Sequence, residues 1–304
     1  MDRYFHPKEV RKLLKSKLLK SEMRAAFLLL IPVFALYIIF VVAPALTTAY
    51  LSFTQFSGFG NPTWVGLENF QRVINDSQTQ KTLFNTLYFT VGTVFLSIIS
   101  ALFLAVLLNQ PLKGRAIFRS IIYLPVVAPM LAVAFVWKFM LDPSPSGLIN
   151  YLTNLFGLGA QQWLSNTRLA MPSVILVSVW KALGYNMVIF LAGLQGIPEQ
   201  LYEAAEIDGA NFFQKFLYIT IPLLKPVTTF VFITSTINAF QAFEQIYGMT
   251  SGGPANSTYT LAYLIYVKGF RSLKFGEASA LAVILVFIVF IFSMLYIRQI
   301  AKEK

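Results

Sequence analysis

Residues 197–226 read IPEQLYEAAEIDGANFFQKFLYITIPLLKP and form a polar segment between two long apolar runs. Four of the chain's 13 acidic residues lie in this segment: Glu199, Glu203, Glu206 and Asp208. An apolar chain has little reason to concentrate acidic residues and helix-forming sequence in one connecting loop. We therefore interpret residues 197–226, called here the acidic loop, as a docking surface for another protein.

The local pattern of the acidic loop predicts two short helices joined by a tight turn. Pro198 suits the first position of a helix, and Gln200–Ile207 contains good helix formers and no breaker. Gly209 tolerates a positive φ angle, and Asp208 can cap the helix that follows it. The second helix is expected to continue until Pro222 disturbs it. The result is a compact pair of helices with exposed carboxylates.

The acidic loop also contains a spaced motif: Glu203-Ala204-Ala205, then Gly209, then Ile219-Thr220-Ile221-Pro222. This motif resembles the EAA loop of binding-protein-dependent ABC importer permeases, whose pattern is EAA, three residues, Gly, nine residues, then I-x-L-P. The one departure is Ile221 in place of Leu. The longer form EAAxxDGA is similar to the carbohydrate-uptake branch, which includes maltose and glycerol-phosphate permeases. In its organisation, the chain resembles this branch over about residues 25–300.

The resemblance implies an all-α integral membrane protein with the ABC type-1 importer permease fold, about six transmembrane helices and both termini in the cytoplasm. It implies a permease subunit in a prokaryotic cell membrane that imports a sugar or related polyol with energy from ATP. The implied partners are two copies of an ABC ATPase subunit, a second homologous permease subunit and an extracytoplasmic solute-binding protein. The residues implied to couple to the ATPase are Glu203, Ala204, Ala205, Asp208 and Gly209.

Composition independently indicates a protein embedded in membrane lipid. Hydrophobic residues make up 57% of the chain and charged residues only 12%, against about a quarter in an average soluble protein. The net charge of +11 does not indicate nucleic-acid binding. The basic residues flank apolar runs and do not form a surface in which basic and aromatic residues alternate.

The types of residue present exclude most catalytic sites. The chain has no cysteine, and its one histidine, His6, lies in a charged tail, so thiolate and histidine centres are not expected. No segment matches GxxxxGK[ST], the phosphate-binding loop of many ATPases. We therefore predict no enzymatic activity, no cofactor and no metal for this chain, with ATP and Mg²⁺ bound by the separate ATPase subunit.

Apolar runs of about 20 residues or more predict the membrane spans. We expect six, at residues 25–53, 83–108, 117–140, 169–194, 227–247 and 278–297. The permease domain then covers residues 25–300, with a type-1 core at about 82–298. Prolines within the first and third spans are expected to be tolerated. Residues 54–81 and 142–167 are expected to be irregular loops, and 258–268 a short interfacial helix.

Basic residues predict the orientation of the chain. Lys and Arg are concentrated in residues 1–24 and 113–119, in the acidic loop, and after the last span. Under the positive-inside rule, this distribution places both termini and the acidic loop in the cytoplasm. Residues 1–24 form a basic N-terminal segment, which is either an amphipathic helix on anionic lipid or a tail that sets the topology.

Polar side chains inside the spans are candidates for a solute path, because such groups usually face the bundle interior or an aqueous cavity. Amide groups can bind sugar hydroxyls, and aromatic rings can stack on a sugar face. The candidates are Trp180, Lys181, Asn186, Asn238, Gln241, Phe243 and Glu244. The structural alternative is that the amides join helices and that Lys181 extends towards the membrane surface.

The loop after the fifth span contains Gly252, Gly253 and Pro254. The stretch from Thr250 to Thr258 resembles the corresponding loop of sugar permeases, whose outer loops meet a solute-binding protein. We therefore regard these three residues as a candidate contact with that protein. A plain tight turn is the alternative.

Three other functions compete with import. An ion-coupled secondary transporter would normally need carboxylates within the membrane, and Glu244 is the only one that we place in a span. A membrane-embedded enzyme lacks the catalytic groups, and a passive channel gives no reason for the acidic loop. The substrate stays open between a sugar and a polyol such as glycerol phosphate, for which Lys181 would be an anion partner.

Overall fold

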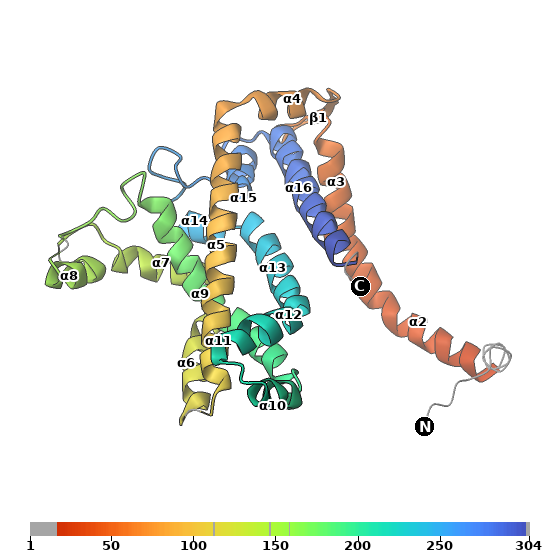
Figure 1. Ribbon diagram of the computed structural model, residues 1–304. Coiled ribbons are helices and arrows are strands. Elements are labelled where there is room, and N and C mark those ends of the chain that lie inside the picture. Colours follow the sequence, from red (N-terminus) through yellow and green to blue (C-terminus); the bar gives the residue numbers. More distant parts are fainter. Residues whose placement is uncertain (1–16, 112, 146, 158, 302–304) are drawn as a thin grey trace.

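The computed structural model describes residues 17–111, 113–145, 147–157 and 159–301. These residues form a helical protein with two short strands (Figure 1). The strands and helix α4 lie at one end of the long helices, here called the hairpin end, and helices α10 and α11 of the acidic loop lie at the opposite end (Figure 1). His6 and most of the basic segment 1–24 lie outside the described residues, and residues 17–24 begin helix α2.

The first span is a long run of helix that leans away from the others. It consists of α2 (Lys17–Tyr37), the π-helical turn η1 (Ile38–Val42) and α3 (Ala43–Leu51). Residues Ala26–Leu51 are long and apolar enough to cross a membrane, and 0% of their most apolar window is buried within this chain. Figure 1 shows α3 beside α16 while α2 projects outward. This span therefore presents its apolar surface to lipid or to another subunit.

Helices α5 (Ser77–Asn109), α9 (Ala170–Gln195) and α13 (Lys225–Phe240) form the central bundle. The buried side of α5 consists largely of small residues that recur every three or four positions: Thr82, Thr86, Thr90, Thr93, Ser97, Ala101 and Ala105. Small side chains let membrane helices approach closely. A Cβ atom added at Gly92 would lie 2.9 Å from the Ile175 side chain, so α5 and α9 are in close contact there.

The third predicted span, residues 117–140, is not one continuous helix. It consists of α6 (Arg115–Val127) and α7 (Met130–Met140), which are bent by 100° relative to each other. The break falls at Ala128 and Pro129, whose ψ angles of 140° and 136° are extended. Proline has no N–H group and disfavours a helical conformation in the residue before it. Pro129 therefore ends α6, whereas Pro125 stays inside that helix.

The fifth predicted span, residues 227–247, ends earlier than expected. Helix α13 stops at Phe240, and a separate short helix, α14, covers Glu244–Met249. The Thr260 hydroxyl donates a hydrogen bond to the Ala242 carbonyl at 2.6 Å. This bond occupies a carbonyl that a continuing helix would use, and it stabilises the turn between the two helices.

The remaining spans agree with the prediction. Helices α5, α9 and α16 (Phe275–Ala301) cover the predicted spans 83–108, 169–194 and 278–297. Four helices are long and apolar enough to cross a membrane, and the number rises to six if each of two bent helix pairs counts as one span. The expected all-α membrane fold is therefore confirmed for the part of the chain that the structure describes.

The predicted irregular loop at residues 54–81 is partly regular. Strands β1 (Thr54–Gln55) and β2 (Thr63–Trp64) pair antiparallel, and α4 (Glu68–Asn75) follows them. The Trp64 ring stacks on Phe53 with a centroid distance of 5.5 Å. This stack fixes the hairpin to the chain segment that follows α3.

The predicted loop at residues 142–167 contains α8 (Leu148–Leu155), whose buried Asn150 organises the turns around it. Asn150 Nδ2 donates hydrogen bonds to the carbonyls of Asp142, Ser144 and Gln161. Asn150 Oδ1 accepts a hydrogen bond from Trp163 Nε1 at 2.8 Å. One amide side chain therefore joins both ends of this loop.

The helix expected at residues 258–268 is present and largely buried, and its position at the membrane surface stays a prediction. It consists of α15 (Leu261–Tyr266) and the π-helical turn η3 (Val267–Arg271). Three of its side chains are fully buried: Leu261, Tyr263 and Leu264. This helix therefore packs inside the protein, between α5 and α16.

Candidate functional site

The acidic loop folds as two helical limbs joined by a tight turn. The first limb is α10 (Glu199–Ile207), and the second consists of α11 (Phe212–Lys215), the π-helical turn η2 (Phe216–Thr220) and α12 (Ile221–Leu223). Gly209 in the turn has a φ angle of +79°, and a Cβ atom added there would meet nothing within 4 Å. The backbone conformation, and not a lack of space, therefore favours glycine at this position.

The predicted cap of the second limb is wrong. Asp208 lies at the end of α10, and Asn211 caps the second limb. Asn211 Oδ1 accepts a hydrogen bond from the Gln214 backbone N–H at 2.9 Å, and Gln214 Oε1 accepts one from the Asn211 N–H at 2.8 Å. This reciprocal pair is a capping box. It leaves the carboxylate of Asp208 exposed at the turn.

Side-chain contacts tie the two limbs of the acidic loop together. The hydroxyl groups of Tyr202 and Thr220 lie 2.9 Å apart and form a hydrogen bond. Lys215 Nζ forms an ion pair with Glu206. Leu224, which follows the second limb, is 1% exposed and packs in a core cluster with side chains of α5 and α9. The loop is therefore a braced unit that is anchored in the bundle.

The predicted coupling residues lie on the surface of this unit. Glu203, Ala204, Asp208 and Gly209 are exposed, and Ala205 is half-buried. Sequence analysis missed the apolar side chains that flank the turn, Ile207, Phe212 and Phe213, which are 87%, 61% and 68% exposed. Large apolar side chains exposed on an otherwise polar loop are candidates for a contact surface. The sequence signal was an apolar residue on each side of a polar turn.

A cavity of about 350 Å³ lies within the bundle, where α5, α9, α13 and the break between α6 and α7 meet, and most of its wall surface is apolar. Lys181, Asn186 and Asn238, three of the predicted solute-path residues, line it. The other polar residues that line it, which sequence analysis did not select, are Thr93, Ser97, Ser178, Tyr185, Thr234, Ser235 and Gln245. Those on α5 and α9 recur at helical spacing, which was the available signal.

Four predicted solute-path residues do not line this cavity. Trp180 packs edge-to-face against Trp137, with a centroid distance of 5.4 Å. Phe243 belongs to an aromatic cluster and lies 5.2 Å from the Tyr266 ring centroid. Gln241 and Glu244 are exposed. The sequence identified residue types that suit a solute path, but it did not show which of them face the cavity. Adjacent positions on a helix point in directions that differ by about 100°.

The cavity contains a buried hydroxyl group without a partner. Thr93 is 8% exposed, and its Oγ1 forms no hydrogen bond with the described residues. The Oγ1 atom itself has almost no exposed surface, so it is hidden from the open part of the cavity. Elsewhere in the lining, Asn186 Nδ2 donates a hydrogen bond to Ser235 Oγ at 3.3 Å. The amide and hydroxyl groups of the lining can exchange hydrogen bonds with a hydroxylated solute.

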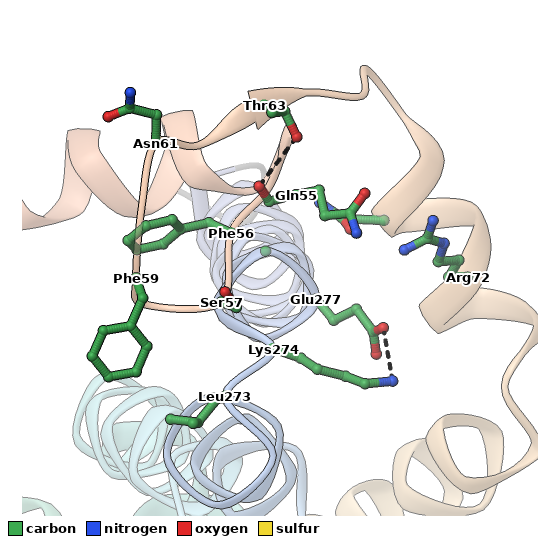
Figure 2. Close-up of a pocket in the computed structure, with 12 residues that line it drawn as sticks. Gln55, Phe56, Ser57, Phe59, Asn61, Thr63, Arg72, Leu273, Lys274 and Glu277 are labelled. Carbon is green, nitrogen blue, oxygen red and sulfur yellow. Dashed lines mark hydrogen bonds and ion pairs between the residues drawn. The ribbon is translucent and has the colours of Figure 1, made fainter.

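A second pocket, of about 560 Å³, lies at the hairpin end (Figure 2). Its walls come from residues 55–72 and 273–277, which are far apart in the sequence. Figure 2 shows Lys274 and Glu277 side by side, with Lys274 Nζ 3.3 Å from Glu277 Oε1. No sequence feature indicated this pocket, because it forms only when the hairpin meets the start of α16.

An ion-pair cluster joins α5, η3 and α16 at the hairpin end. Lys268 Nζ lies 2.8 Å from Glu277 Oε2 and 3.4 Å from Asp76 Oδ2. Partial burial opposes ionisation of Asp76, but the Gln78 backbone N–H and the Lys268 charge outweigh it and lower the pKa of Asp76. Burial also opposes the charge of Lys268, but Glu277 and Asp76 outweigh it and raise the pKa of Lys268. This arrangement is called here the Lys268 cluster.

The loop at residues 250–258 is held tightly. Gly252 is buried, and a Cβ atom added there would lie 2.3 Å from the Tyr259 ring. Lys81 Nζ donates a hydrogen bond to the Ala255 carbonyl at 2.7 Å, which joins the loop to α5. Gly253 and Pro254 are half-buried, and the exposed residues of the loop are Ser251, Ala255 and Asn256. The role of Gly252, Gly253 and Pro254 in binding-protein contact stays a prediction.

Within the described residues, no group of three or more His, Cys, Asp or Glu side chains is arranged to hold a metal ion. The predictions that this chain binds no metal and no cofactor remain predictions.

Comparison with protein families gives one clear match. Residues 94–303 match the family described as "Binding-protein-dependent transport system inner membrane component". The trehalose/maltose transport system permease protein MalF of Thermococcus litoralis is 33% identical over 286 residues, which cover 94% of this chain and 96% of the relative. The sn-glycerol-3-phosphate transport system permease protein UgpA of Agrobacterium fabrum is 36% identical over 280 residues, covering 91% and 94%.

Solved structures give the same fold. A chain in the crystal structure of a bacterial ABC transporter that imports the acidic polysaccharide alginate matches with a TM-score of 0.80 and 22% identity. The match covers 93% of this chain and 98% of that one. A second crystal structure of an alginate transporter, in complex with an alginate pentasaccharide-bound periplasmic protein, also matches with a TM-score of 0.80, over 92% of this chain and 96% of that one.

Proposed function

Because the chain belongs to the family of binding-protein-dependent transport system inner membrane components, we propose that it is the membrane-spanning permease subunit of an ATP-driven importer of a sugar or related polyol. It is a multi-pass membrane protein of a prokaryotic cell. The observation that carries the functional proposal is the acidic loop. It is a braced, exposed pair of helices with the EAA spacing, and it is anchored in the bundle through Leu224.

The acidic loop is proposed to dock on a separate ATPase subunit, which binds ATP and Mg²⁺. Glu203 and Asp208 supply polar contacts, Ala204 and Ala205 permit close approach, and Gly209 forms the turn. The two limbs are braced against each other, so a movement of the ATPase would be passed to α9 and α13 without being absorbed by the loop. ATP binding would open the spans outward, and hydrolysis would reset them inward.

The complete importer is proposed to contain two ATPase copies, a second homologous permease and an extracytoplasmic solute-binding protein. The unburied first span supports a second membrane subunit, because it has apolar surface that this chain does not cover. A partner that delivers solute is supported by the similar alginate transporter, whose crystal structure contains an alginate pentasaccharide-bound periplasmic protein. The exposed residues of the loop at 250–258 and the hairpin-end pocket offer polar surface for such a contact.

The cavity lined by Lys181, Asn186 and Asn238 is proposed to be this chain's share of the solute path. Its largely apolar wall also carries hydroxyl and amide groups, which can exchange hydrogen bonds with the hydroxyl groups of a sugar. The relatives named above carry disaccharides and a glycerol phosphate, and both kinds of solute are rich in oxygen atoms.

An ion-coupled transporter is the weaker alternative. Glu244, which sequence analysis placed in a span, lies in the separate helix α14 and is exposed. Glu277 lies near the start of α16 and is paired with Lys268. Coupling to an ion gradient would usually use a carboxylate deep within the membrane, and family membership favours ATP-driven import.

Co-purification and uptake test this proposal together. The chain would be expressed with an affinity tag in its native host, and the proteins that co-purify in mild detergent would be identified. We expect an ATPase with a GxxxxGK[ST] loop and a second permease. Glu203→Lys is expected to remove the ATPase and abolish uptake without removing the chain from the membrane, and Gly209→Asp is expected to uncouple hydrolysis from uptake.

Glu68→Lys provides the matched control. Like Glu203, Glu68 is an exposed acidic residue on a helix, but it lies at the hairpin end. This variant should retain the ATPase. If Glu203→Lys takes up solute at the normal rate, or if the tagged chain purifies without any ATPase, the docking role of the acidic loop is wrong.

A further inference from the structure

The break between α6 and α7 leaves backbone carbonyls without helical donors. The last carbonyls of any helix have no N–H partner within that helix. Val126 is the last residue but one of α6, so its carbonyl is one of these. The following residues, Ala128 and Pro129, are extended, so the chain turns away. In a membrane bundle such carbonyls need a donor from a neighbouring element.

Lys181 of α9 supplies that donor. Its Nζ atom donates a hydrogen bond to the Val126 carbonyl at 2.9 Å, and its side chain is half-buried. A cation at the C-terminal end of a helix also interacts favourably with the helix dipole. Glu244 adds an electrostatic attraction to the same ammonium group. Lys181 is therefore engaged by the protein itself.

Gly184, one turn further along α9, lets the two helices approach closely. A Cβ atom added at Gly184 would lie 2.4 Å from the Ile122 carbonyl oxygen and 2.7 Å from Tyr123 Cα. These are backbone atoms, so they cannot move aside as a flexible side chain could. No residue of α6 is buried, and the helix is attached by this contact with α9, by the Lys181 hydrogen bond and, on the α5 side, by a hydrogen bond from Arg119 Nη2 to the Leu108 carbonyl at 2.9 Å.

The attached segment forms part of the cavity wall. Val126, before the break, and Met130, after it, both line the cavity, together with Ser178, Lys181 and Tyr185 of α9. We propose that Lys181 is a positioning residue: with Gly184, it holds the α6–α7 bend against α9 and so sets the shape of the cavity. This inference rests on the proposed function only in taking the cavity as the solute path.

The experiment measures the position of the bend without any solute. The natural sequence contains no cysteine, so a thiol introduced by Met130→Cys is the only one in the chain. Its rate of reaction with a membrane-permeant maleimide is measured in native membranes, in the complete importer. We expect Lys181→Met to increase the labelling rate of the thiol by about fivefold or more, because the bend moves more freely. This is the order of change expected when a charge-assisted hydrogen bond is lost.

Two further variants separate positioning from solute contact. Lys181→Arg keeps the cation and the donor, and it should restore a rate near that of Met130→Cys alone. Gly184→Ala should raise the rate as Lys181→Met does, because its Cβ atom would push α6 away from α9. It also serves as the test if Lys181→Met fails to reach the membrane.

Lys138→Met is the control, because Lys138 is an exposed lysine at the end of α7. It should leave the rate unchanged. The proposal is overturned if Lys181→Met and Gly184→Ala both label at the unmodified rate. It is also overturned if Lys181→Met loses sugar-stimulated ATP hydrolysis while its labelling is unchanged, since Lys181 would then be a solute ligand. Because labelling needs no solute or ATP, failure of the importer assignment would appear separately, in uptake.

Discussion

One hydrogen bond joins the hydroxyl groups of Tyr202 and Thr220, and it can be removed without changing the packing of the Tyr202 ring. Tyr202→Phe removes one hydroxyl group and a hydrogen bond worth about 1 kcal/mol. We expect the ATPase to remain bound while solute uptake per ATP hydrolysed falls by up to about fivefold, because the limbs move more freely. Uptake and hydrolysis would be measured together in proteoliposomes.

Tyr218→Phe is the matched control for this prediction. Tyr218 lies in the same loop, but its ring is exposed. The control should have the unmodified ratio of uptake to hydrolysis. If Tyr202→Phe also keeps that ratio, the hydrogen bond does not contribute to coupling.

At the residue scale, the sequence predicted the motif better than the contacts. The spacing of Glu203 and Gly209 located the turn, because glycine adopts a positive φ more readily than other residues. The cap was assigned to Asp208 although Asn211 and Gln214 have the spacing of a capping box, so that signal was present and was missed. The hydrogen bond between Lys181 and Val126 could not be predicted, because it joins residues that only the bend of α6 brings together.

At the scale of elements, the Lys268 cluster predicts how stability depends on pH. The pKa of Asp76 is lowered in the folded state, so its contribution is full above the unfolded value of about 3.9 and is lost as the pH falls through the folded value. The pKa of Lys268 is raised, so its contribution is full below about 10.4 and is lost as the pH rises through its folded value. Between these two pH limits, the charged Lys268 cluster stabilises the contact of α5, η3 and α16.

The corresponding experiment compares thermal unfolding of Asp76→Asn with the unmodified protein in detergent, from neutral to acid pH. We expect the variant to unfold at a lower temperature at neutral pH and the difference to shrink as the pH falls below about 4. Glu68→Gln is the control, because Glu68 pairs with Arg72 in an exposed setting where little stability is at stake. A difference that persists in acid would mean that the Asp76 charge is not its cause.

The sequence predicted where most helices lie, because apolar runs of sufficient length must be helical in lipid. It did not predict where α6 and α13 would end. Pro125 and Pro129 are the same residue type in one apolar run, yet only Pro129 breaks the helix. The end of α13 depends on the hydroxyl of Thr260, which comes from a later element. Such endings are set by tertiary contacts that local sequence does not contain.

At the scale of the whole molecule, the first span predicts dependence on a second subunit. Within the described residues, Ala26–Leu51 bury no side chain of their most apolar window, so the apolar surface of this span is left uncovered. A partner that binds only the folded protein stabilises it. We expect the chain co-expressed with its second permease to unfold several degrees higher than the chain alone in the same detergent, and to elute with that permease.

An unrelated membrane protein expressed at the same level is the control for that experiment and should give no stabilisation. Equal unfolding temperatures, with separate elution of the two permeases, would show that lipid alone covers the first span. The same reasoning explains why the arrangement of the first span relative to the other helices could not be predicted from the sequence. Its surface is apolar on all sides, which fits lipid and protein equally well.

The π-helical turn η2 at Phe216–Thr220 affects how the acidic loop responds to the deletion of a residue. A π turn holds one residue more than the α-helical turn it replaces. Deleting one residue there would restore an uninterrupted α-helix, so the chain should still insert and fold. Such a deletion would keep the two ends of the second limb in nearly the same rotational phase, whereas deleting a residue from regular α-helix rotates one end about the axis by roughly 100°. The spare residue thus marks the place in this limb where the loss of one residue should leave the direction of the EAA surface, and therefore coupling, least changed.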